Sequence, residues 1–169
     1  MTMTISGLEE LLQHEKMEEI LGIENDGCKA EIRRLSDSEE IIDYHGRTRR
    51  IKMRYKLNPD QRNDRFSFLQ GPVFEIMHFC VSPQNFGYGT KFMSHLIKHF
   101  QEVGIKSIVL QATNSRAARF WGRLGFLPHP LASDEKLLMY RVSDSDQLLM
   151  TNSRPGFSID AHERNHVMH

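Results

Sequence analysis

The sequence has few cysteines and no long apolar segment. Cys28 and Cys80 are its two cysteines in 169 residues. A chain of this length can bury roughly two-thirds of its unfolded surface, so it needs no disulfide or metal to hold a core, and both thiols are expected to be free. Apolar runs are no longer than four or five residues, and no basic-then-apolar segment opens the chain. We therefore expect neither a membrane span nor a secretory signal, and predict an intracellular protein of the cytoplasm or nucleus.

Net charge is also absent, because 22 Lys and Arg balance 22 Asp and Glu. The balance hides a division: residues 1–45 hold 4 basic and 12 acidic side chains, whereas residues 46–65 hold 8 basic and 2 acidic ones. Apolar and basic residues alternate in the basic stretch, which is the period of a half-buried strand. They are Arg50, Ile51, Lys52, Met53, Arg54, Tyr55, Lys56 and Leu57. We expect a solvated strand face that is offset by the acidic stretch upstream, and we favour this over nucleic-acid binding.

The first half of the chain is predicted to contain short helices and strands. The expected elements are a helix at 6–21, a strand at 29–35 after the turn at 25–27, a helix at 36–44, the basic strand and a short strand at 66–69. Gly22 stops the amphipathic pattern of the first helix. Ser36 and Glu39 form a capping box, which predicts the second helix.

The second half alternates strands with helices, as in an α/β protein. The expected elements are a buried strand at 73–81, a helix from about 92 to 103, a second buried strand at 107–110, a helix that begins at Asn114 and stops at Gly125, and a last strand at 137–142. Residues 143–169 are polar and weakly patterned. We therefore predict one domain over residues 1–142, followed by a polar tail.

A glycine-rich turn joins the first buried strand to the helix that follows it. Gly87 and Gly89 let the backbone approach a ligand closely, and the N–H groups of the first helical turn can hold a phosphate. The turn does not fit the dinucleotide fingerprint, because Phe92 stands where a third glycine is required. It does not fit the P-loop either, because Lys91 follows Thr90. These residues alone leave an ordinary strand-to-helix turn open beside a phosphate site.

Two ordered motifs resemble the GNAT superfamily of N-acetyltransferases. Residues 84–89, QNFGYG, match its [Gln/Arg]-x-x-Gly-x-[Gly/Ala] signature, and residues 114–126, NSRAARFWGRLGF, are similar to its N-x-x-A-x-x-aromatic-aromatic-x-x-x-G-F element. The resemblance covers about residues 73–142 and implies the GNAT acyl-CoA N-acyltransferase fold, a mixed central sheet flanked by helices. About 38 residues separate the first strand from the fourth. We therefore expect the family's usual two-helix segment to be trimmed.

The resemblance implies acetyl transfer from acetyl-CoA to an amine, with no metal. Backbone N–H groups of 84–90 would hold the pyrophosphate, the strands at 73–81 and 107–112 would splay apart, and the acetyl carbonyl would face a backbone N–H of the fourth strand. The residues that the resemblance assigns to the cofactor are Phe79, Val81, Gln84, Asn85, Phe86, Gly87, Tyr88, Gly89, Thr90, Asn114, Ala117 and Phe120. The expected partners are acetyl-CoA and an amine acceptor, without nucleic acid or membrane, and a homodimer stays open.

Glu75 is the candidate general base, because an attacking amine is protonated near pH 7 and must lose a proton. It is the one acidic side chain of its strand and lies six residues before Val81, where the histone-acetyltransferase branch of the family places its glutamate. A glutamate at a sheet edge that faces water or pairs with one of the basic-strand residues is the alternative interpretation. Strand alternation places His78 on the opposite face from Glu75, as a core histidine.

The general acid is less evident from the motifs. Trp121 stands where many family members have a tyrosine, and an indole N–H is far too weak an acid. The histone-acetyltransferase branch tolerates a plain aromatic there, and a thiol is a good leaving group, so the thiolate needs little help. Tyr140 is the reserve acid. Cys80 has no evident activating partner and is expected to pack as a small hydrophobe.

Two other functions stay open. A catalytically silent GNAT-fold module that binds CoA or a partner would also account for Trp121 and for the short region before residue 73. His162 to His166 fit the H-E-x-x-H pattern of a zinc hydrolase. This pattern lies in a tail with no apolar face to anchor a helix, so the acetyltransferase is the favoured function.

Overall fold

The structure is a computed structural model, and it describes residues 7–22, 29–58, 64–69, 71–133 and 136–147. In chain order its elements are α1 (Leu8–Leu11), α2 (His14–Leu21), β1 (Lys29–Arg34), β2 (Glu39–His45), β3 (Arg50–Asn58), the 3-10 helix η1 (Asp64–Phe66), β4 (Val73–Ser82), α3 (Tyr88–Glu102), β5 (Ser107–Ala112), α4 (Ser115–Arg123), β6 (Leu127–Pro128) and β7 (Leu137–Val142).

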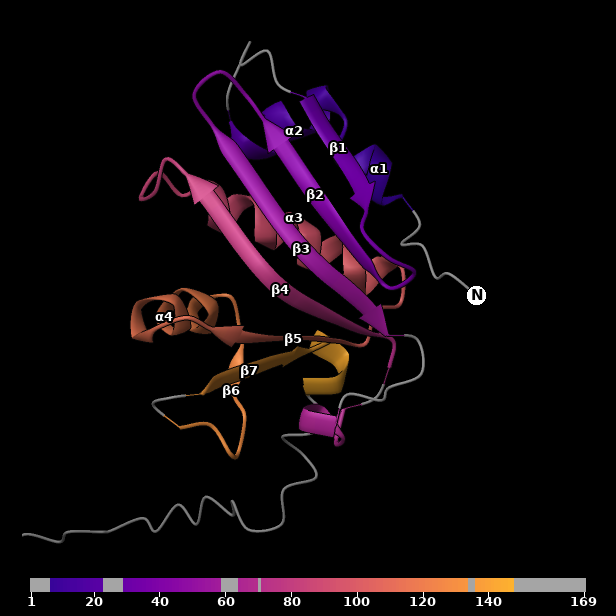
Figure 1. The fold of residues 1–169 in the computed structure, drawn as a ribbon, viewed down its shortest axis with the longest axis vertical. Coiled ribbons are helices and arrows are strands. Elements are labelled where there is room, and N and C mark those ends of the chain that lie inside the picture. The colour runs from indigo at the N-terminus through magenta and orange to yellow at the C-terminus, as the bar shows by residue number, and fades with distance from the viewer. Residues whose placement is uncertain (1–6, 23–28, 59–63, 70, 134–135, 148–169) are drawn as a thin grey trace, which may run out of the picture.

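Seven strands form one sheet in the order β1-β2-β3-β4-β5-β7-β6, with helices packed on it (Figure 1). Strands β4 and β5 are parallel, and the other neighbours are antiparallel. The predicted α/β class with a mixed sheet is therefore confirmed. Among the described helices, none is long and apolar enough to cross a membrane. The predicted turn at 25–27, Cys28 and the motif at 162–166 lie outside the described residues.

One face of the sheet is buried under α2, α3 and α4. The alternating apolar residues of the basic strand lie on this face, and Ile51, Met53, Tyr55 and Leu57 are at most 8% exposed. They share one core cluster with buried helical residues, which are Met17, Ile20, Leu21, Phe92, Met93, Leu96, Ile97, Phe100 and Trp121. The strand predicted from alternation is thus confirmed as β3, and its apolar side anchors the helices by hydrophobic burial.

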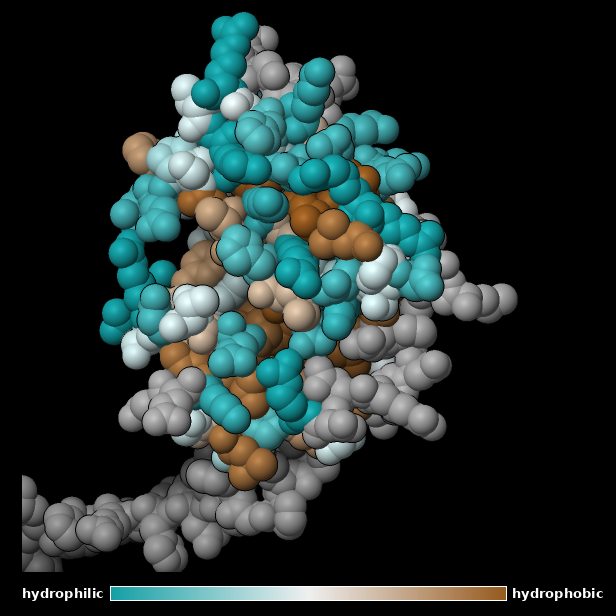
Figure 2. All heavy atoms as spheres, viewed as in Figure 1, coloured by the Kyte–Doolittle hydropathy of each residue, from teal (hydrophilic) through white to brown (hydrophobic). Residues whose placement is uncertain are grey.

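The opposite face of β1, β2 and β3 carries paired charges. Arg54 Nη2 lies 2.8 Å from Glu39 Oε1. Asp43 is buried, and the guanidinium groups of Arg33 and Arg50 both lie 3.4 Å from its Oδ2 atom. Figure 2 shows mostly hydrophilic side chains over these strands. Upstream acidic residues were expected to offset the charge of the basic strand. This is confirmed for Arg50, which pairs with Asp43, and for Arg54, which pairs with Glu39; both acidic residues belong to β2.

The predicted helix at 36–44 is wrong, because this segment contributes strand β2. The Ser36 hydroxyl does accept a hydrogen bond from the Glu39 N–H at 3.1 Å, as in a capping box. The bond belongs to the turn between β1 and β2, where the Leu35 N–H donates to the Glu39 carbonyl at 2.9 Å. Serine caps N–H groups in turns as well as in helices. Pairing of β2 with a strand on each side outweighs the local helix signal.

Two other predicted elements differ from the structure. The helix predicted at 6–21 is interrupted at Gln13, whose ψ of 146° is extended, so α1 and α2 are separate helices. The strand predicted at 66–69 is wrong, because a hydrogen bond from Leu69 N–H to the Phe66 carbonyl closes a turn there. Phe66 and Leu69 are both buried. Their spacing of three residues fits a turn and not a strand.

Helices α1 and α2 precede β1 instead of following it. All residues between β1 and β3 are described, and none of them is helical. The expected trimming of the two-helix segment is confirmed over that part of the chain. Leu8 and Leu12 of the N-terminal helical region join the same core cluster as α3. The two N-terminal helices therefore cover the sheet, although they come before β1 in the sequence and not after it.

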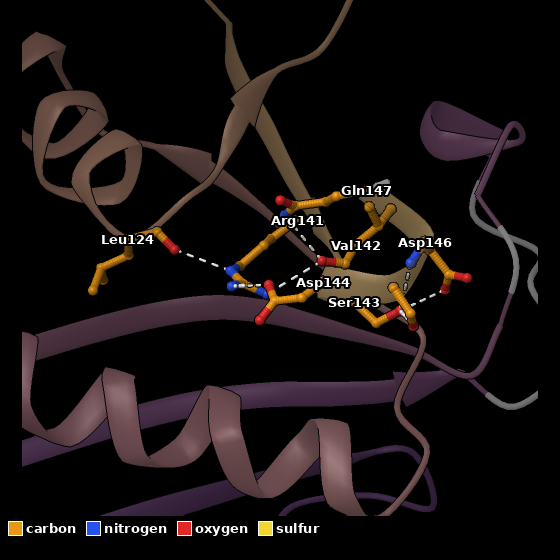
Figure 3. A network of polar contacts seen from close by, with 8 residues as sticks. Leu124, Arg141, Val142, Ser143, Asp144, Asp146 and Gln147 are labelled. Atoms are coloured by element: carbon orange, nitrogen blue, oxygen red, sulfur yellow. Dashed lines mark hydrogen bonds and ion pairs between the residues drawn. The ribbon is translucent and has the colours of Figure 1, made fainter. Parts of the chain in front are cut away.

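Arg141 on β7 ties the end of α4 to the last strand (Figure 3). Its Nε donates to the Leu124 carbonyl at 3.0 Å, its Nη1 to the Val142 carbonyl at 3.2 Å, and its Nη2 to Asp144 Oδ1 at 2.8 Å. A cation at this position satisfies a terminal helix carbonyl and complements the helix dipole. Gly125 has a φ of +88°, and a Cβ there would lie 3.2 Å from Arg141 Nε. The glycine of the second motif therefore makes room for this arginine.

We expect Arg141→Met to lower the free energy of unfolding by about 1–3 kcal/mol, because the partly buried carbonyl of Leu124 loses its donor. Urea denaturation followed by circular dichroism measures the change. Asp144→Asn is the matched control, since it removes the exposed side of the same contact and should cost less than about 1 kcal/mol. Equal losses in the two variants would contradict the capping role.

The buried Asp43 makes stability depend on pH. Burial alone would raise its pKa, but the hydrogen bond and charge of Arg50, aided by His45, hold that pKa below the ordinary value of 3.8. A depressed carboxyl pKa stabilises the fold above the unfolded-state pKa, and this contribution is lost as the pH falls through the folded-state pKa.

Asp43→Asn should therefore be less stable than the wild type at pH 7, and the difference should shrink as the pH approaches 3. Urea denaturation at pH 7, 5 and 3 checks this, with the exposed Asp37→Asn as control. A difference between wild type and Asp43→Asn that stays constant with pH would argue against an ionised, paired Asp43.

Candidate active site

The parallel strands β4 and β5 pair over only part of their length. Their register runs from Val73 with Ser107 to Ile76 with Leu110 and stops there, although β4 continues to Ser82. Figure 1 shows the two strands diverging from this common segment. We call the ends that no longer pair with each other, residues 77–82 of β4 and 111–112 of β5, the split. Its closed end is where pairing stops, at Ile76 and Leu110, and its open end is at Ser82 and Ala112. The expectation that these strands splay apart is confirmed.

A β-bulge in β4 coincides with the start of the split. The register with β3 skips Met77, because successive β3 residues face Ile76 and His78. A bulge bends the strand and shifts by one residue which side chains point to each face. Glu75 and His78 therefore lie on the same face of the sheet, so the expectation from simple alternation is wrong.

The bulge also changes the burial of β4. Residues 73–76 are buried, whereas every residue from Met77 to the end of the strand is exposed or half-buried. The expectation of a strand covered on both faces therefore holds only where β4 pairs with β5. His78 and Cys80 are both exposed. The core position expected for His78 and the packed position expected for Cys80 are wrong, because both side chains lie on the sheet face away from the helices, beyond the point where β5 pairs with β4.

Helix α3 begins directly after the open end of β4. Its N-cap, Gly87, has a φ of 77° and no side chain caps the first turn, so N–H groups of that turn are left for another acceptor. Asn85 has a φ of 70°, a conformation that asparagine tolerates better than most residues. These two left-handed residues turn the chain sharply from β4 into α3. The glycine motif thus positions exposed backbone donors beside the split.

Aromatic side chains connect the two arms of the split on the α3 side. The Phe79 ring of β4 lies 6.2 Å from Phe120 and 5.5 Å from Trp121 of α4, measured between centroids. Gly89 lies against this group, since a Cβ there would be 3.4 Å from Val81 Cγ2 and 3.5 Å from Phe120 Cζ. Four of the residues that the family resemblance assigns to the cofactor, Phe79, Val81, Gly89 and Phe120, therefore lie together beside the split.

The second motif begins where it was predicted. The Asn114 side chain accepts a hydrogen bond from the Ala117 N–H at 2.9 Å and caps α4. Arg116 in the same turn donates to Asn85 Oδ1 at 2.9 Å, which links the start of α4 to the glycine turn at the end of β4. A role for Arg116 is not predicted from the sequence, because nothing in its local pattern indicates a partner 31 residues away.

Glu75 lies at the closed end of the split, on the sheet face away from α3. Arg65 of η1 donates from Nη2 to its Oε1 at 2.8 Å, and Arg65 Nη1 lies 3.5 Å from Gln111 Oε1 on β5. The Glu75 side chain is 11% exposed and that of Arg65 is 48% exposed. A paired Glu75 was the alternative interpretation, but its partner comes from η1 and not from the basic strand.

Tyr140 lies on the same face as Glu75, one strand beyond β5. Both residues are register partners of Val109, so about two strand spacings, roughly 10 Å, separate their backbones. The Tyr140 ring is buried and packs edge to face on Phe68 at 5.1 Å. The structure therefore brings Tyr140 to the face of Glu75 but not to the split itself.

The segment that carries Arg65 is fixed by a buried histidine. His129 Nδ1 accepts a hydrogen bond from the Leu131 N–H at 2.9 Å, and its Nε2 lies 2.5 Å from the Arg65 carbonyl. A carbonyl only accepts, so Nε2 carries the proton in this arrangement. The ring also packs edge to face on Phe66, with centroids 5.1 Å apart. Backbone and side-chain contacts together hold η1 over the closed end of the split.

No cluster of metal-ligating side chains occurs in the described part of the chain. The polar groups at the split are a carboxylate, a guanidinium, an amide and the backbone N–H groups of a helix start. This set can bind an anionic ligand at one end and exchange a proton at the other.

Comparison with known protein families agrees with this geometry. Residues 52–126 match the family model described as "Acetyltransferase (GNAT) family". The matched segment contains both the split and the glycine turn. Among curated proteins, none matches the chain.

Solved structures that are similar to the chain have low sequence identity to it. GCN5 from Tetrahymena is 19% identical, covering 63% of this chain and 69% of that chain with a TM-score of 0.46. The structure of AtaTR bound with acetyl-CoA is 18% identical, covering 66% and 73% with a TM-score of 0.41. The KacTA–DNA complex is 17% identical, covering 89% and 92% with a TM-score of 0.42.

We expect Gly87→Ala to lower the free energy of unfolding by about 1–2 kcal/mol, because a side chain at positive φ is strained. A Cβ at Gly87 would meet no atom within 4 Å, so a steric clash is not the cause. Gly122→Ala in α4 is the control. It also has open space and should stabilise the helix by about 0.5–1 kcal/mol. Thermal denaturation of both variants measures the two effects, and a neutral Gly87→Ala would contradict the conformational argument.

Proposed function

We propose that the protein is an N-acetyltransferase that transfers the acetyl group of acetyl-CoA to a primary amine of a small molecule or protein, with Glu75 as the general base. The observation that carries the proposal is the split between β4 and β5, which opens beside the uncapped start of α3. The unpaired backbone of β4 can form hydrogen bonds with the amide groups of an extended ligand such as pantetheine. The N–H groups at the start of α3 can bind the phosphates of the same ligand.

The cofactor would follow the split from its open end. N–H groups of residues 84–90 would hold the pyrophosphate, with Gly87 and Gly89 keeping the backbone accessible. The pantetheine arm would hydrogen-bond to the β4 main chain near Phe79 and Val81. Asn114, Ala117 and Phe120 would line the arm and the thioester from the α4 side. In this arrangement the acetyl group would lie near the bulge, beside the part of β4 that follows Glu75.

The transfer itself is a direct displacement. An ammonium loses its proton to the Glu75 carboxylate, and the amine lone pair attacks the thioester carbonyl carbon. A C–N bond forms, the C–S bond breaks, and CoA leaves as a thiolate. A backbone N–H at the bulged end of β4 would stabilise the negative charge on the carbonyl oxygen during attack.

Little acid assistance is required at the leaving group, because a thiol with a pKa of about 8.5 is a good leaving group near neutral pH. Trp121 supplies none. Tyr140 is kept as the reserve acid, and Tyr140→Phe separates the two cases. A turnover close to that of the wild type would remove Tyr140 from the reaction.

Glu75→Gln should lower turnover by about 10²–10⁴-fold, which is the usual contribution of a general base. Gln is close to Glu in shape and keeps an oxygen for Arg65, so affinity for acetyl-CoA should hardly change. The loss should shrink as the pH rises, because more of the amine deprotonates without help. Thiol release from acetyl-CoA, measured over a panel of amines and compared with calorimetric affinity, tests this.

Glu31→Gln is the matched control, because Glu31 on β1 also pairs with an arginine, Arg33, at 3.5 Å. It should leave turnover unchanged. Normal turnover of Glu75→Gln at pH 7 would place the base elsewhere. Calorimetric binding of acetyl-CoA by the wild type without transfer to any amine would favour the silent CoA-binding module, and no binding at all would contradict both functions.

A further inference from the structure

Arg65 bridges the two strands where they begin to separate. It contacts Glu75 on β4 and Gln111 on β5, and Gln111 is the first β5 residue beyond the paired segment. The guanidinium therefore stands over the closed end of the split. The Arg65 side chain is about half exposed, whereas the carboxylate it contacts is nearly buried. A molecule that reaches Glu75 from this face meets Arg65 as well.

The surroundings of Glu75 are cationic on this face of the sheet. Lys56 on β3 is the register partner of Glu75, so its side chain points to the same side. Glu39, the next carboxylate across the sheet, is in an ion pair with Arg54. An acceptor that carries only positive charge is repelled by Arg65 and Lys56 as its ammonium approaches Glu75. An acceptor with an anionic group beside its amine is attracted by the same cations.

Resting on the proposed acetyl transfer at Glu75, we propose that the acceptor is a small zwitterionic amine of the α-amino-acid class. Its carboxylate binds Arg65, whose planar guanidinium can hold two oxygens of one anion. Its ammonium takes the place of Arg65 as the partner of Glu75 and gives up a proton to that carboxylate. Arg65 Nη2 and Glu75 Oε1 are 2.8 Å apart in the free protein, so the two groups are close enough to be reached together by opposite charges on neighbouring carbons, as an α-amino acid has.

The contact between Arg65 and Glu75 then has a definite use in the free protein. It keeps the carboxylate and the guanidinium next to each other until a zwitterion binds, which replaces this contact with one contact to each group. His129 and the aromatic rings around it fix the Arg65 backbone, so the guanidinium starts from a defined place. Preorganised contacts of this kind increase selectivity, because little ordering is left for the bound state.

The test compares free α-amino acids with their α-amides, which keep the side chain and the amine and lack the anion. Thiol release from acetyl-CoA is measured over a panel of such matched pairs and over polyamines. The wild type should favour the acids over the amides by about 10- to 100-fold in kcat/KM, the usual effect of one charged hydrogen bond. Arg65→Gln should reduce that preference to near unity, and Arg65→Lys should retain much of it.

Arg33→Gln is the matched control, since Arg33 is 51% exposed and also contacts a buried carboxylate, Asp43. It should leave the preference for acids unchanged. Equal or better use of the amides or polyamines by the wild type would overturn this inference and leave the proposed function intact. A preference that survives in Arg65→Gln would also overturn it. Failure to acetylate any acceptor would overturn the proposed function and the inference with it.

Discussion

The loss of pairing between β4 and β5 is the constraint on which the rest of the site depends. The two strands pair through Ile76 and Leu110 and then separate. The bulge at Met77 lies at that point and turns β4 away from its neighbour. A strand edge inside a sheet is costly unless its backbone groups find other partners. Binding of an extended, amide-bearing ligand is a direct way to satisfy them.

The separated arms are supported from one side by the hydrophobic core. Phe79 of β4 and Trp121 of α4 meet across the split, and Trp121 belongs to the same buried cluster as α3. Arg141 holds the other end of α4 against β7. These contacts hold β4 against α4 and α4 against β7 beyond the point where β4 and β5 stop pairing. On the opposite face, η1 and His129 place Arg65 over the closed end, so cofactor and acceptor are expected to approach from different sides.

The sequence was informative where a function depends on local backbone geometry. The glycine turn and the Asn114 cap were predicted at the residues where they occur, because positive φ angles and helix caps are properties of a few neighbouring residues. Features set by partners far along the chain were not predicted. The bulge that moves His78 to the face of Glu75 depends on the register with β3, and no local pattern shows it.

The same distinction explains the errors at β2 and η1. Ser36 and Glu39 make the bond of a capping box, but a strand on each side of residues 39–45 decides their conformation. Arg65 lies in an irregular polar segment, and only the tertiary structure brings it to Glu75 and Gln111. Sequence patterns therefore predicted the residues proposed for the cofactor and Glu75, whereas the contact of Arg65 with Glu75 became visible only in the structure.

The most direct test of the central claim is an amide NMR titration of the protein with CoA. If the split holds the cofactor, the largest shifts should occur at residues 77–90 and at the start of α4, with the N–H groups of Gly87 to Thr90 moving as expected for contact with a pyrophosphate. Titration with inorganic pyrophosphate should move the glycine turn and leave Phe79 and Val81 in place. Shifts confined to another surface, or no shifts at saturating CoA, would contradict the account.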